Sequence, residues 1–99
     1  MTSAPVSGPD RVGPVLTQGV SAMAVVAAIR EENLDVSVDD QGGYLRVLVP
    51  ARCRVSREAI ERELGRPFVL PRDLELIMPS FRGTLQLGAD AVVWEAQRR

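Results

Sequence analysis

The sequence lacks histidine and lysine and contains a single cysteine, Cys53. Without histidine, the chain cannot form a Ser-His-Asp triad, a Cys-His pair, a histidine zinc site or an imidazole that titrates near neutral pH. One cysteine can form neither an internal disulfide nor a cysteine-rich metal site. We therefore interpret Cys53 as an inert thiol in a protein from a reducing compartment.

Long hydrophobic runs and an excess of one charge are also missing. No apolar run approaches the roughly 20 residues that cross a bilayer, and the N-terminus lacks the basic start and long apolar core of a signal peptide. The 12 basic and 13 acidic residues leave a net charge of −1, so no strong field draws the chain to nucleic acid. We expect a cytoplasmic protein whose partners are neither nucleic acid nor membrane.

The composition is that of one globular domain. With 99 residues, of which 45% are hydrophobic and 25% charged, the chain has room for a single core. Residues 1–11 are small, polar and interrupted by prolines and a glycine, which is typical of a flexible tail. We expect one domain over residues 12–96 and a frayed C-terminus over 97–99.

Hydrophobic spacing predicts an α+β fold in which two helices pack on a mostly antiparallel sheet. Two segments with apolar residues every three to four positions predict helices over 21–32 and 57–64. Alternating apolar and polar residues predict strands, over 12–16, 34–39, 44–49, 74–78, 84–87 and 91–95. The expected order is β-α-β-β-α-β-β-β.

Residues typical of helix ends support both helices. Ser21 and Ser56 can each accept a hydrogen bond from a first-turn N–H, and Gly65 suits a left-handed turn after the second helix. Val55 and Ile60 occupy the two positions of a hydrophobic staple. Because only 4% of the residues are aromatic, we expect the larger ones in the core, namely Phe68, Phe81 and Trp94.

No set of residues has the spacing of a catalytic, metal or phosphate site. One run of arginines has no intervening acid: Arg46, Arg52, Arg54 and Arg57. A nucleic-acid site would need aromatic residues between them, and only Tyr44 is near. The run forms either a solvated strand end or a patch that docks on an acidic protein surface.

Three motifs occur in a characteristic order and spacing: Leu64-Gly65-Arg66-Pro67-Phe68, Asp73-Leu74-Glu75 and Pro79-Ser80-Phe81-Arg82-Gly83. Together with the opening Val12-Gly13-Pro14-Val15, they resemble the small effector (coupling) proteins of bacterial multicomponent di-iron monooxygenases. The similarity runs from about residue 12 to residue 95. It is greatest to the effectors of the toluene and alkene monooxygenase branch.

The resemblance implies a monooxygenase effector-like fold with no cofactor, no metal and no active site. Such a protein is a monomer when free, binds the hydroxylase component that holds the di-iron centre, and tunes its active site, oxygen activation and coupling. We expect contact through exposed loops, above all through one face that combines the 39–44 hairpin with the arginines near 52–57. The candidate partner-binding residues are Asp39, Asp40, Tyr44, Arg52, Arg54, Arg57, Ser80 and Arg82.

Two other classes of protein remain open. A ferredoxin-like small-molecule-binding regulatory domain fits the same element order, and it would dimerise and hold its ligand at a strand–helix turn, here Leu16–Val20. A stand-alone enzyme is the third class, but the sequence offers it no acid–base constellation. Binding to a hydroxylase without any added small ligand would separate the first class from the second.

Overall fold

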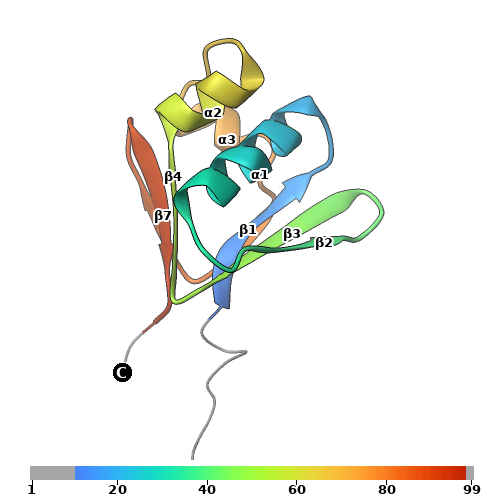
Figure 1. Ribbon diagram of the computed structural model, residues 1–99, viewed down its shortest axis with the longest axis vertical. Helices are drawn as coiled ribbons and strands as arrows, with labels where there is room; N and C mark the ends of the chain where they lie inside the picture. Colours follow the sequence, from blue (N-terminus) through green and yellow to red (C-terminus); the bar gives the residue numbers. More distant parts are fainter. Residues whose placement is uncertain (1–10, 98–99) are drawn as a thin grey trace, which may run out of the picture.

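The computed structural model describes residues 11–97, which form seven strands and three helices (Figure 1). In chain order these are β1 (Arg11–Thr17), α1 (Val20–Glu32), β2 (Ser37–Asp40), β3 (Tyr44–Pro50), β4 (Arg52–Ser56), α2 (Arg57–Leu64), α3 (Arg72–Glu75), β5 (Ser80–Arg82), β6 (Thr84–Leu87) and β7 (Ala91–Glu95). The predicted α+β class is confirmed. Residues 1–10 and 98–99, which carry most of the expected tail and frayed end, lie outside the described residues.

The strands form two antiparallel sheets. One has four strands in the order β2-β3-β1-β5, and the other has three in the order β4-β7-β6. The chain passes from the first sheet to the second between β3 and β4, at Ala51, whose φ is 67°. Figure 1 shows the two sheets diverging from this corner, with α1 across the opening and α2 and α3 beyond it.

The core fills the space between the sheets and the helices. From the four-stranded sheet it receives Leu16, Leu45 and Val47, which are at most 6% exposed, and α1 contributes Val25 and Ile29. The second sheet contributes Cys53, Val55, Val92 and Trp94. Of the three aromatics expected inside, Phe68 and Trp94 are buried. Phe81 is not, because it lies on the short edge strand β5 and is 43% exposed.

The predicted strand over 74–78 is wrong, since this segment contains the end of the short helix α3 and a turn. Leu74 and Met78 are buried, whereas Leu76 between them is 77% exposed. Residues four apart lie on the same side of a strand and also on the same face of a helical turn. The apolar pair Leu74 and Met78 therefore fits either structure. Pro71 directly precedes the helix, and proline is readily accommodated at a helix start.

Strands β4 and β5 were not predicted, and α3 replaces a predicted strand, so the observed order is β-α-β-β-β-α-α-β-β-β. In β4, buried Cys53 and Val55 alternate with exposed Arg52 and Arg54. This is the alternation typical of a strand, although the sequence analysis noted only the arginines. Strand β2 also begins later than expected, at Ser37.

The caps of α2 are confirmed, and the cap of α1 is wrong. The Ser56 hydroxyl accepts a hydrogen bond from the Ala59 N–H at 3.1 Å, and Gly65 adopts φ 80°. Helix α1 instead begins at Val20 after Gly19, without a side-chain cap. Val55 and Ile60 of the predicted staple are both fully buried.

Candidate functional site

The four-stranded sheet has one face against the helices and one outer face. Antiparallel partners point to the same side of a sheet, and the register therefore identifies the outer residues. Asp39 pairs with Arg46, Arg46 with Val15, and Val15 with Ser80, which makes one row across all four strands. In the two central strands β1 and β3 the residues between these, such as Leu16 and Leu45, are buried.

Further pairs extend this row on both sides. Tyr44 pairs with Thr17, Arg11 with Pro50, Ser37 with Leu48, and Arg82 with Gly13. We call the whole set the four-stranded face, which consists of Arg11, Gly13, Val15, Thr17, Ser37, Asp39, Tyr44, Arg46, Leu48, Pro50, Ser80 and Arg82.

The structure divides the eight candidate residues between two sheets. Asp39, Tyr44, Ser80 and Arg82 lie together on the four-stranded face. Asp40 belongs to the same hairpin, where its Oδ1 accepts hydrogen bonds from Gln18 Nε2 at 2.7 Å and from the Gly42 N–H at 3.0 Å.

The other three candidates belong to the second sheet and its helix. Arg52 and Arg54 lie on the outer side of β4, and Arg57 is the first residue of α2. The expected face that joins the 39–44 hairpin with these arginines is therefore not a single sheet face.

These three arginines have acidic partners that are distant in the sequence. Arg52 contacts Glu95 at 3.3 Å, and Arg54 contacts Glu32 at 3.2 Å. Arg57 contacts both Glu61 and Asp90 at 3.3 Å. The hydrogen bond to Asp90, and then the negative charge of Glu61, raise the pKa of Arg57. These arginines have no acidic neighbour in the sequence between them, but the fold brings acids beside them from α1, α2, β7 and the β6–β7 turn.

The four-stranded face differs from the second sheet because most of its arginines have no acidic partner among the described residues. Its single acid, Asp39, lies 3.4 Å from Arg46, while Arg11 and Arg82 have no salt bridge within residues 11–97. Half-buried Val15 and Leu48 lie between the arginines, and Tyr44 is 47% exposed. Sequence reasoning omitted Arg11 from the candidates and placed Arg46 only in the arginine run, because only the strand register shows that they share a face with Arg82.

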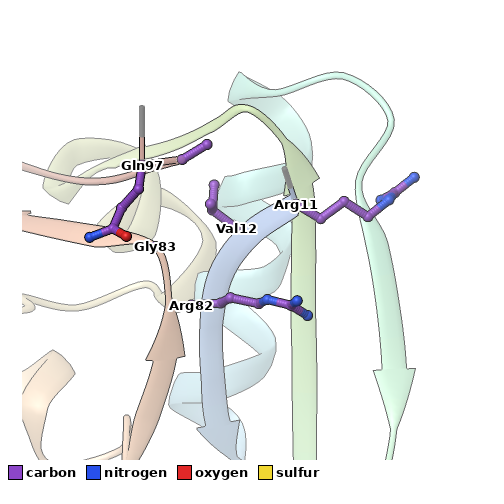
Figure 2. Close-up of a pocket in the computed structure, with 6 residues that line it drawn as sticks. Arg11, Val12, Arg82, Gly83 and Gln97 are labelled. Carbon is purple, nitrogen blue, oxygen red and sulfur yellow. The ribbon is translucent and has the colours of Figure 1, made fainter. Parts of the chain in front are cut away.

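A shallow hollow of about 300 Å³ adjoins one edge of this face, lined by Arg11, Val12, Arg82, Gly83, Ala96 and Gln97. Figure 2 shows the Arg11 and Arg82 side chains extending away from Gln97, in the same direction, toward β3 and β2. Their guanidinium groups therefore lie over the sheet instead of converging on a small ligand in the hollow.

In the described part of the chain we find neither a buried polar cluster nor a possible metal site. Over residues 11–97 no charged or polar side chain is buried, and no three His, Cys, Asp or Glu residues gather as a possible metal site. Cys53 is fully buried, and this burial raises its pKa to about 12, so the thiol stays protonated at neutral pH. Within the same residues, no helix is both long and apolar enough to cross a membrane.

Together, these features define a small α+β protein in which every charged or polar residue from 11 to 97 is at least partly exposed. The profile of the MmoB/DmpM family matches residues 10–95, and the chain belongs to this family. It is 37% identical to the alkene monooxygenase system effector subunit of Xanthobacter autotrophicus (strain Py2), over 95% of this chain and 96% of that protein.

Solved structures show the same fold. A chain from a phenol hydroxylase–regulatory protein complex superposes with a TM-score of 0.78 and 22% identity, covering 88% of this chain and 99% of that one. The soluble methane monooxygenase regulatory protein B superposes with a TM-score of 0.68 and 21% identity, covering 96% of this chain and 71% of that one.

Proposed function

We propose that this protein is the effector (coupling) subunit of a multicomponent monooxygenase of the alkene or toluene type. It binds the hydroxylase component that holds the di-iron centre, and it tunes that component's active site, oxygen activation and coupling without catalysing a reaction itself. The observation that carries the proposal is the 37% identity, along nearly the whole of both chains, to an alkene monooxygenase effector subunit.

Such a protein acts through differential binding. If it binds one conformation of the hydroxylase more tightly than another, it shifts their populations by the ratio of the two affinities. A difference of about 1.4 kcal/mol shifts the equilibrium tenfold. No cofactor is needed for this action, only a surface that distinguishes the two conformations. The candidate partner-binding residues Asp39, Asp40, Tyr44, Arg52, Arg54, Arg57, Ser80 and Arg82 remain a prediction about that surface.

The free protein is a monomer in the cytoplasm under this proposal. Its lone cysteine is unpaired and buried, which suits a reducing compartment.

A ligand-binding regulatory domain has less support. It would present the backbone of the Leu16–Val20 turn to a small molecule. In the structure the Thr17 N–H donates to the Ile77 carbonyl at 2.8 Å, and the Gln18 N–H donates to the Gly43 carbonyl at 3.0 Å. These two donors of the turn are therefore already used within the chain.

The proposal is tested by binding to the immobilised di-iron hydroxylase component of the protein's own oxygenase, with no small ligand added. We expect saturable retention of a colourless protein that has no oxygenase activity alone. Failure to bind the hydroxylase, or stoichiometric iron or zinc that survives chelation, would contradict the proposal.

A further inference from the structure

We propose that the four-stranded face docks on an acidic, carboxylate-bearing surface of the hydroxylase component. Arg11, Arg46 and Arg82 provide the charge, and Val15 and Leu48 provide the apolar centre. This inference rests on the proposed function and identifies which of the two sheets makes the contact.

The first argument is charge. The four-stranded face carries three guanidinium groups and one carboxylate, that of Asp39. Arg46 shares this carboxylate, and Arg11 and Arg82 find no acid within residues 11–97. Guanidinium groups pair bidentately with carboxylates, so an acidic partner would supply what the chain itself does not.

The second argument is accessibility. Helix α1 covers the inner face of this sheet, and no described element covers the outer one (Figure 1). Val15 and Leu48 are only half-buried, and Tyr44 is 47% exposed. Tyrosine and arginine around an apolar centre are the residues that most often dominate the free energy of protein–protein binding.

The third argument is shape. A Cβ atom on Gly13 would lie 2.2 Å from the carbonyl oxygen of Val47, so this position of β1 carries no side chain. Arg82 is its partner across the strands, and Figure 2 shows the Arg82 side chain crossing β1 toward β3. The absent side chain thus lets the guanidinium group of an edge strand reach the middle of the face.

The second sheet lacks this combination. Its outer arginines, Arg52 and Arg54, already contact Glu95 and Glu32. A partner carboxylate would have to displace an internal one, which leaves little net gain in Coulomb energy.

The test compares two double variants of equal charge change. Arg11→Glu with Arg82→Glu alters the four-stranded face. Arg30→Glu with Arg66→Glu is the matched control, because both arginines are exposed, lie in α1 and after α2, and have no salt bridge within the described residues. Affinity for the purified hydroxylase is measured by titration over a range of salt concentrations.

We expect the R11E/R82E variant to bind at least about tenfold more weakly, with slower association and a flatter salt dependence than wild type. The R30E/R66E control should stay within about threefold of wild type. Equal losses in both doubles, or wild-type affinity in a folded R11E/R82E variant, would overturn the docking face and leave the effector function standing. Wild-type protein that does not bind would overturn the proposed function, and the docking face with it.

A conservative variant keeps the test valid if R11E/R82E does not fold. Arg82→Gln removes one charge from the edge strand without adding another. We expect several-fold weaker binding and an unchanged thermal melt. Full affinity of a folded R82Q variant, together with wild-type binding that is insensitive to salt, would contradict the docking face.

Discussion

Gly13 lies where the backbones of β1 and β3 leave no room for a side chain. Its φ is 147°, and an added Cβ would meet the Val47 carbonyl oxygen at 2.2 Å. We predict that Gly13→Ala lowers the free energy of unfolding by about 2 kcal/mol or more, because both strain and a clash with backbone must be relieved.

Gly43→Ala is the matched control, since nothing lies within 4 Å of a Cβ there and its φ is not positive. Urea denaturation monitored by Trp94 fluorescence measures both variants. Similar stabilities of the two would show that β1 and β3 do not approach each other as described.

Cys53 makes stability depend on pH in the alkaline range. Burial raises the pKa of its thiol from 9.0 to about 12. Below about pH 9 both the folded and the unfolded chain keep the proton. Between 9 and 12 the unfolded chain releases it first, so stability falls as pH rises, by up to about 1.4 kcal/mol per pH unit.

We therefore predict a steeper loss of melting temperature from about pH 9 to 11 in wild type than in Cys53→Ala. The native thiol should also resist alkylation until the chain unfolds. Parallel pH profiles of the two proteins would show that this thiol is not buried.

At the scale of elements, Glu32 joins the end of α1 to β4 and the start of α2. Its carboxylate accepts hydrogen bonds from the Ser56 N–H at 3.1 Å and from Arg54 Nη1 at 3.2 Å, and also from the Ser56 hydroxyl. The same Ser56 hydroxyl caps α2. One acid thus fixes how two helices and a strand meet.

We predict that Glu32→Ala lowers the free energy of unfolding by about 1–3 kcal/mol, because several donors lose a charged acceptor. Glu58→Ala is the control, since Glu58 is exposed. Its neighbour one helical turn later, Arg62, forms its salt bridge with Glu31 instead, at 2.7 Å. Thermal melts compare the two variants. Equal effects would show that the Glu32 contacts contribute nothing beyond a surface charge.

Elements with strong local signals were predictable, and those decided by their surroundings were not. The second helix followed from Ser56 and Gly65, and the last hairpin from two alternating segments around a turn. Helix α3 has only four residues, so propensity alone could not favour it over a strand that places Leu74 and Met78 on the same side.

At the scale of the whole molecule, the sequence could predict that an arginine-bearing surface contacts the partner. It could not predict which arginines form that surface. Alternation within a strand shows which of its residues share a face, such as Arg52 and Arg54. It does not show which strands become neighbours, and so it could not reveal that Arg11, Arg46 and Arg82 come together. Nor could it reveal that the acid Glu95 lies beside Arg52.

The most direct test of the proposed function is the ratio of product formed to reductant consumed by the reconstituted oxygenase, measured while this protein is titrated into its hydroxylase and electron-transfer components. We predict that turnover and this ratio rise together and saturate, and that the R11E/R82E variant reaches the same plateau only at higher concentration. A ratio that stays constant as wild-type protein is added would contradict the account, because the protein would then not couple electron delivery to substrate oxidation.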